Sequence, residues 1–133
     1  MNAERQLLVT AVQRMTLDDG SGLRTTVFLK GCPLKCPWCC NPETQSGKPE
    51  IFYNEERCAV FKGSKYCGSC NDVFNLENTC PFGARESVGE WIALDQLKAK
   101  IEASGYRRVT FSGGEPLLQG ESLCALIRSL KEE

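Results

Sequence analysis

The chain has 133 residues, 41% of them hydrophobic, which is enough for one domain with a modest core. Sixteen Lys and Arg residues against 17 Asp and Glu give a net charge of −1, so bulk charge does not support nucleic acid or a membrane surface as a partner. The chain contains no histidine, and this excludes Ser-His-Asp catalysis, Cys-His catalysis and histidine-ligated metal chemistry by its own residues.

Nine cysteines are many for a chain of this length. The first residues lack the basic flank and apolar stretch of a signal peptide, and no apolar run approaches the ~18 residues of a membrane span. We therefore expect a reducing, cytoplasmic compartment. In that compartment an odd number of cysteines favours metal or cluster ligation over a complete disulfide framework.

Two short strands are predicted before the first cysteine. Leu7–Arg14 is a strand candidate, and the Gly and Asp content of Asp18–Gly22 indicates a turn. Thr25–Leu29 is a β-branched and apolar run, which predicts a buried strand that ends before Gly31. Four prolines between residues 31 and 49 break any helix, so this stretch is predicted to be a loop.

After residues 50–83, which hold four cysteines and little periodicity, strands and helices alternate. Ser87–Ile92 predicts a small hairpin that turns at Gly89, and Arg108–Phe111 predicts another strand. Apolar residues at helical spacing predict one helix that stops near Gly105 and a last helix; they are Leu94, Leu97 and Ile101, then Leu123, Leu126, Ile127 and Leu130. This order predicts an α/β fold with parallel pairing and right-handed crossovers.

The first cysteine cluster directly follows the Thr25–Leu29 strand. Cys32, Cys36 and Cys39 have the spacing C-x3-C-x2-C, and three thiolates on one loop can hold three corners of a [4Fe–4S] cube. An ordinary electron carrier uses four cysteines, so one iron would stay open to a small molecule, like the open position of a catalytic zinc. A structural zinc or iron site with its fourth ligand from elsewhere is the alternative that spacing leaves open.

Gly113, Gly114 and Glu115 follow the Arg108–Phe111 strand. In a parallel sheet they lie on the same rim as Cys32, and adjacent glycines let a backbone group approach a ligand closely. Most Gly-Gly-Glu triplets are ordinary turns, which is the alternative interpretation here.

Four motifs run in order along almost the whole chain: Asp19–Lys30, Gly31–Cys39, Asn41–Glu43 and Thr110–Gln119. Together they resemble the glycyl-radical-enzyme activating enzymes, which are members of the radical S-adenosylmethionine superfamily. The resemblance implies a partial (β/α) barrel, truncated here to about two β/α units. We expect residues 1–49 to supply the first strands and the cluster loop, and residues 84–133 to continue the barrel as helix, strand and helix.

The resemblance also implies the cofactors. A [4Fe–4S] cluster on Cys32, Cys36 and Cys39 would leave one iron to be chelated by the amino and carboxylate groups of S-adenosylmethionine. Trp38 and its neighbours Cys39 and Cys40 would lie against the adenine, and the stretch Gly113, Gly114 and Glu115 would meet the methionine amino group. Without the motif, Trp38 is equally typical of a packed core aromatic.

Two positions depart from the family pattern. Family members usually have proline where Ser21 stands, which should only loosen a turn. They usually have histidine or a small polar residue where Cys40 stands. Because Cys39 and Cys40 are adjacent, they cannot easily point at one corner of a cube, and we expect Cys40 to be a bystander thiol.

Cys58, Cys67, Cys70 and Cys80 form a second cluster with spacings x8, x2 and x9. Four thiolates complete either a [4Fe–4S] cube or an all-thiolate zinc site. Many activating enzymes of the longer type carry a ferredoxin-like insert here, usually with more cysteines, so residues 50–83 are expected to be such an insert with one auxiliary cluster or zinc. The ninth cysteine, Cys124, is expected to be a core residue of the last helix.

The resemblance implies an anaerobic enzyme whose cluster cleaves S-adenosylmethionine reductively to a 5′-deoxyadenosyl radical, which takes hydrogen from a glycine of a partner enzyme. No side chain would act as a catalytic group, since cluster and cofactor carry the chemistry. A flavodoxin or ferredoxin would supply the electron, and the glycyl radical enzyme would be the protein substrate. The rival hypothesis is a non-catalytic iron–sulfur or zinc module for electron transfer.

The pattern supplies only two strand–helix units, Thr25–Ser104 and Arg108–Lys131, whereas the family's barrel has about six. A parallel strand normally has a neighbour on each side, so Val109 and Phe111 are expected on an open edge. We therefore expect the chain to be the amino-terminal half of an activating enzyme.

Overall fold

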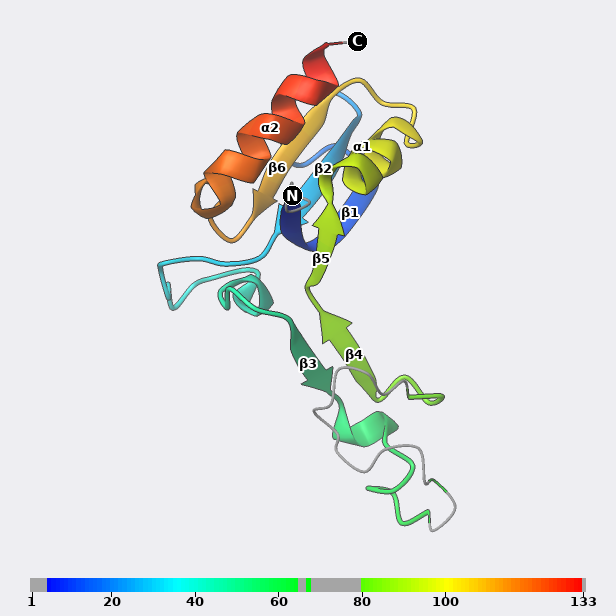
Figure 1. Ribbon diagram of the computed structural model, residues 1–133. Helices are drawn as coiled ribbons and strands as arrows, with labels where there is room; N and C mark the ends of the chain where they lie inside the picture. Colours follow the sequence, from blue (N-terminus) through cyan, green and yellow to red (C-terminus); the bar gives the residue numbers. More distant parts are fainter. Residues whose placement is uncertain (1–4, 65–66, 68–79, 133) are drawn as a thin grey trace. The chain divides into compact units, whose positions relative to one another are not determined.

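The computed structural model describes residues 5–64, 67 and 80–132 (Figure 1). The chain divides into two compact units. Unit 1 is formed by residues 1–48 and 89–133, and unit 2 by residues 49–88. The insertion of unit 2 into unit 1 places the cysteine-rich stretch on a body of its own.

Unit 1 is built on a four-stranded sheet with the order β5-β1-β2-β6. Its strands are β1 (Gln6–Thr16), β2 (Arg24–Leu29), β5 (Glu90–Ala93) and β6 (Val109–Gly113). β1 is antiparallel to both β2 and β5, and β2 is parallel to β6. The predicted parallel pairing is therefore confirmed for β2 and β6, and the mixed α/β class is confirmed as well.

Two α-helices pack on one face of this sheet, α1 (Leu94–Glu102) and α2 (Gly120–Lys131) (Figure 1). Alternate residues of β1 and β2 point to this face because side chains alternate along a strand. The leucines and isoleucines predicted on the two helices meet them in one core, whose buried members are Leu7, Val9, Val27, Leu29, Ile92, Leu97, Ile101, Leu123 and Leu126.

β6 lies at the edge of the sheet in the part of the chain that the structure describes. Val109 and Phe111 are half-buried on it and pack against the core from one side. The expected open edge is therefore confirmed.

Unit 2 contains the antiparallel pair β3 (Glu50–Tyr53) and β4 (Arg85–Val88), in register from Glu50 opposite Val88 to Tyr53 opposite Arg85. The short 3-10 helix η2 (Glu55–Arg57) follows β3, and the side chain of Asn54 caps it by accepting a hydrogen bond from the Glu56 amide. Cys58 and Ala84 are its buried apolar residues among those described.

The predicted hairpin at Gly89 is wrong. β4 and β5 flank Gly89, but β4 pairs with β3 while β5 pairs with β1, so they belong to different sheets. Gly89 has a φ of +93° and marks the passage from unit 2 to unit 1 rather than a turn between partners.

Cys124 is also placed differently from the expectation, because it is exposed on α2 and not in the core. In the described ranges, neither α-helix combines the length and the apolar character that crossing a membrane requires.

Candidate functional site: the cysteine loop and its surroundings

The cysteine loop leaves the carboxyl end of β2 and is closed by hydrogen bonds at its base. The Gly31 amide donates to the Thr44 carbonyl (2.6 Å), and the Cys32 amide donates to the Gln45 carbonyl (2.9 Å). Thr44 is buried at the end of the 3-10 helix η1 (Pro42–Thr44). We call the paired segments Lys30–Cys32 and Glu43–Gln45 the loop neck, since they fix both ends of the segment that carries the thiols.

The glycines after β6 pack directly on the loop neck. Gly113 lies opposite Leu29 in the β2–β6 pair, and the amides of Gly114 and Glu115 donate to the carbonyls of Leu29 (2.9 Å) and Gly31 (2.8 Å). A Cβ on Gly114 would overlap with the Gly31 carbonyl. The two motifs thus meet at the carboxyl ends of parallel strands, and glycine is required there because backbone approaches backbone.

One side chain ties this rim to β1. The Gln119 amide nitrogen donates to the carbonyls of Leu8 and Lys30 (both 3.0 Å), and its oxygen accepts from the Leu8 amide (2.7 Å). Gln119 ends the 3-10 helix η3 (Pro116–Gln119), whose first turn is capped by the Glu115 carboxylate through the Leu117 amide (3.0 Å). The rim is therefore assembled from β1, β2 and the segment after β6.

Cys32 lies at the end of the loop neck, and Cys36, Cys39 and Cys40 follow on the loop beyond it. Cys32, Cys36 and Cys39 are half-buried and Cys40 is exposed, and a turn joins the Cys39 amide to the Cys36 carbonyl (3.1 Å). No group of three or more Cys, Asp or Glu side chains is arranged to hold a metal ion among the residues described. The assignment of the three cysteines as ligands stays a prediction.

Trp38 is 81% exposed on the same loop. The alternative of a packed core aromatic is therefore wrong, and its indole is free to meet a ligand.

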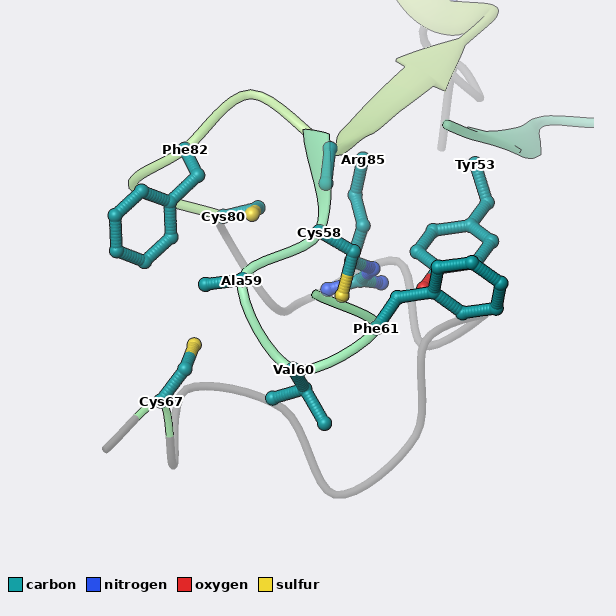
Figure 2. Close-up of a pocket in the computed structure, with 10 residues that line it drawn as sticks. Tyr53, Cys58, Ala59, Val60, Phe61, Cys67, Cys80, Phe82 and Arg85 are labelled. Atoms are coloured by element: carbon teal, nitrogen blue, oxygen red, sulfur yellow. The ribbon is translucent and has the colours of Figure 1, made fainter. Parts of the chain in front are cut away.

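Unit 2 holds a cavity of about 170 Å³ (Figure 2). Three of the four predicted cysteines line it, Cys58, Cys67 and Cys80, together with apolar and aromatic side chains and Arg85. Cys70 lies outside the described residues. The structure thus brings three members of the second cluster around one space, although they are not arranged as a metal group.

Two thiols of this cavity sit among hydrogen-bond donors. The Tyr53 hydroxyl, followed by the backbone amides of Phe61 and Val60, lowers the pKa of Cys58 from its usual 9.0, against the opposing effect of burial. Backbone amides of Ala84, Phe82 and Arg85 lower the pKa of Cys80 in the same way. Donors aimed at sulfur stabilise the thiolate, which is the form that binds a metal.

Sequence reasoning missed three residues of these sites. Lys30 is 2% exposed at the loop neck, Gln119 bridges β1 and the loop neck, and Tyr53 contacts Cys58. Gln119 lay inside a recognised motif without an assigned role. Lys30 directly follows an apolar strand, at the end where the cysteine loop begins. This position is the one sequence feature that could have indicated a role for it.

Comparison with known proteins gives the family. Residues 18–133 match the protein family described as "4Fe-4S single cluster domain". The chain belongs to this family.

The curated relatives are activating enzymes. The chain is 38% identical to the (2S)-3-sulfopropanediol sulfolyase activating enzyme of Bilophila wadsworthia, over 94% of this chain and 50% of the relative. It is 39% identical to the pyruvate formate-lyase 2-activating enzyme of Escherichia coli over 90% of this chain and 40% of the relative. It is 35% identical to the benzylsuccinate synthase activating enzyme of Thauera aromatica, over 83% of this chain and 42% of the relative.

The resemblance to glycyl-radical-enzyme activating enzymes is confirmed by these relatives, whose names are those of enzymes. The chain spans half of their length or less. No solved structure matches it.

Proposed function

We propose that this chain carries the cluster-binding part of a glycyl-radical-enzyme activating enzyme of the radical S-adenosylmethionine type. The observation that carries the proposal is the meeting of the cysteine loop neck with Gly113, Gly114 and Glu115 at the carboxyl ends of β2 and β6. Ligands of α/β proteins gather at this end of parallel strands. A family match over residues 18–133, described as a 4Fe-4S domain, supports a cluster of this type in the chain.

The donor set fits an iron–sulfur cluster. Cys32, Cys36 and Cys39 offer three partly exposed thiols on one loop, and thiolates are the ligands that such clusters take. When bound, cluster and S-adenosylmethionine supply a one-electron reductive cleavage that releases methionine and a 5′-deoxyadenosyl radical, which takes a hydrogen atom from a glycine of the partner enzyme. The side chains of this chain position these groups and shield them from water.

Residues around the thiols would hold the cofactor. Trp38, with Cys39 and Cys40, is proposed to lie against the adenine, and its 81% exposure leaves the ring accessible. Gly113, Gly114 and Glu115 are proposed to meet the methionine amino group. The side chain of Glu115 already caps η3, so its contribution to the ligand would come from the backbone or from its free carboxylate oxygen.

The wider setting of the proposal follows from the family. Unit 1 is proposed to be part of a (β/α) barrel, with β6 at an edge where a further strand can pair. The partner is a glycyl radical enzyme, and the electron comes from a flavodoxin or ferredoxin. Nine cysteines favour the reducing cytoplasm as the location.

Unit 2 is proposed to be a ferredoxin-like insert with an auxiliary centre on Cys58, Cys67, Cys70 and Cys80. The lowered pKa values of Cys58 and Cys80 and the cavity that both line support thiolate ligation there. Iron–sulfur and zinc are the two candidates, and metal and sulfide analysis of anaerobically prepared protein separates them.

The test uses the full chain, reconstituted anaerobically with iron and sulfide. Adding S-adenosylmethionine should change the electron paramagnetic resonance spectrum of the reduced cluster and yield 5′-deoxyadenosine. Cys36→Ala should abolish both signals, while Cys124→Ala, at an exposed cysteine on α2 outside the site, should keep them.

An unchanged spectrum in the wild-type protein would favour the rival, a non-catalytic iron–sulfur or zinc module. Retained cleavage in Cys36→Ala would contradict the ligand assignment.

A further inference from the structure

Lys30 is buried to 2% exposure at the start of the cysteine loop. Lysine is rarely buried, because an ammonium group loses hydration unless polar partners replace the water. The Lys30 Nζ donates to the Glu43 carbonyl at 2.5 Å. The cost of burying this side chain at this position calls for a role that an apolar residue could not fill.

The ammonium group adds one hydrogen bond to those that close the loop neck. Three consecutive residues, Lys30, Gly31 and Cys32, donate to the three consecutive carbonyls of Glu43, Thr44 and Gln45. The last two of these bonds are made by backbone amides. The first is made by the Lys30 side chain, and it reaches the carbonyl nearest to the thiols along the returning segment.

The rest of Lys30 is anchored to unit 1. Its amide donates to the Leu8 carbonyl (2.9 Å), and its carbonyl accepts from the Gln119 side chain (3.0 Å). Gly89 passes so close that a Cβ there would stand 2.6 Å from Lys30 Cδ. Since the backbone of Lys30 is held by two hydrogen bonds and its stem passes close to Gly89, the ammonium group can hold the Glu43 carbonyl in one place.

We propose that Lys30 is a positioning residue for the cluster site, which holds the returning end of the cysteine loop so that Cys32, Cys36 and Cys39 keep the spacing that a cluster needs. This inference rests on the proposed cluster at these three cysteines. It goes beyond that proposal because Lys30 ligates nothing and acts through the loop neck.

The first arm of the test needs no cluster. In the metal-free full chain, amide hydrogen exchange at Gly31 and Cys32 should be faster in Lys30→Met, which keeps the apolar stem but removes the donor. Lys48→Met is the matched control, because Lys48 is exposed just after the same loop. It should leave these amides unchanged.

The second arm uses the protein reconstituted with iron and sulfide. Iron release to a chelator should be about tenfold faster in Lys30→Met, the factor that corresponds to losing one charge-assisted hydrogen bond. The resonance spectrum of the reduced cluster with S-adenosylmethionine should also change in line shape. Lys30→Gln keeps a donor on a shorter side chain, so its rate of iron release should lie between those of Lys30→Met and wild type.

Leu97→Ala, which removes a core side chain on α1, tests whether a general loss of stability could cause the same spectral change. This variant should unfold at a lower temperature than wild type without the change in line shape. If Lys30→Met does not fold, amide exchange, iron release and line shape are compared between Lys30→Gln and wild type.

The outcomes separate this proposal from the one on which it rests. Unchanged exchange at Gly31 and Cys32, or faster exchange with unchanged iron release and line shape, would overturn the role of Lys30. A wild-type chain that binds no iron would overturn the proposed cluster, and the exchange arm would still decide whether Lys30 closes the loop.

Discussion

The two cysteine-rich regions of this chain are held in different ways. The loop of Cys32, Cys36 and Cys39 stands on a hydrogen-bonded neck, and this neck rests on a sheet whose core is closed by two helices. Among its described residues, unit 2 has a single two-stranded sheet, and its buried apolar residues there are Cys58 and Ala84. A two-stranded sheet alone is marginally stable in water.

The difference between the two regions suggests different roles for their cysteines. In unit 1 the core is apolar, and Cys32, Cys36 and Cys39 are not among its members. In unit 2 the donors gathered around Cys58 and Cys80 stabilise thiolates, and we expect the proposed auxiliary metal to supply folding free energy there, as in small metal-stabilised domains.

Removing the metal should therefore have the largest effect, and it should fall on unit 2. After anaerobic chelation, limited proteolysis followed by mass spectrometry should find the first cuts between residues 49 and 88, while β1, β2 and α2 stay protected. Cys58→Ser should give the same cuts before chelation, because it removes a proposed ligand of the proposed auxiliary centre.

Cys124→Ser, at an exposed cysteine on α2, is the control and should leave the pattern of cuts unchanged. Equal protection of both units after chelation would show that the difference between the two regions does not exist.

Gly114→Ala should strongly destabilise unit 1. The new Cβ would overlap with the Gly31 carbonyl and approach the Thr44 carbonyl to 2.9 Å, and neither backbone group can move aside easily. We expect the free energy of unfolding to fall by about 3 kcal/mol, the upper part of the usual range for overpacking. Thermal unfolding of the metal-free chain measures it.

Gly120→Ala is the matched control for this variant. Gly120 is helical and nothing lies within 4 Å of a Cβ built there. The substitution should be neutral or stabilise by up to about 1 kcal/mol, since alanine loses less backbone entropy. Equal effects at both glycines would contradict the close packing of the rim on the loop neck.

The sequence predicted the parts of the fold that depend on local pattern. Thr25–Leu29, the helix with Leu97 and the last helix appear where apolar periodicity placed them. Gly89 misled the prediction, because a glycine with positive φ between two short strands is typical of a hairpin. Here its missing side chain instead makes room for the stem of Lys30, a contact between residues 59 positions apart.

The residues of the candidate sites also divide into those that local sequence pattern reveals and those that it does not. The spacing of Cys32, Cys36 and Cys39 is visible along the chain, whereas the Gln119 bridge to Leu8 joins residues 111 positions apart. The Tyr53 contact with Cys58 is local, but nothing in a tyrosine five residues before a cysteine indicates a hydrogen bond. Polar contacts of this kind depend on tertiary geometry that periodicity does not encode.

Gln119→Ala should weaken unit 1 less than Gly114→Ala, by about 2 kcal/mol. It removes three hydrogen bonds of modest net value and leaves the buried Leu8 amide without its acceptor. Denaturant unfolding of the metal-free chain measures the change. Gln96→Ala, on the exposed side of α1, should be within about 0.5 kcal/mol of wild type.

Tyr53→Phe should have the smallest effect, and it should be confined to unit 2. The Tyr53 hydroxyl is the largest cause of the lowered pKa of Cys58, so its loss should raise that pKa toward the usual 9.0. The pH dependence of alkylation of Cys58 in the metal-free chain measures the shift. Tyr106→Phe, in unit 1, should leave the titration unchanged.

The same pKa has a consequence for stability. Because the folded-state pKa of Cys58 is below its unfolded value, the native state binds fewer protons between the two values. The contribution of the Cys58 thiolate to the stability of metal-free unit 2 should therefore grow as the pH rises across that window, be fully present above about 9, and be lost as the pH falls through the folded-state pKa. Tyr53→Phe should narrow the window from its lower side. A window of equal width in both proteins would show that the backbone amides of Phe61 and Val60, rather than the tyrosine, stabilise the thiolate.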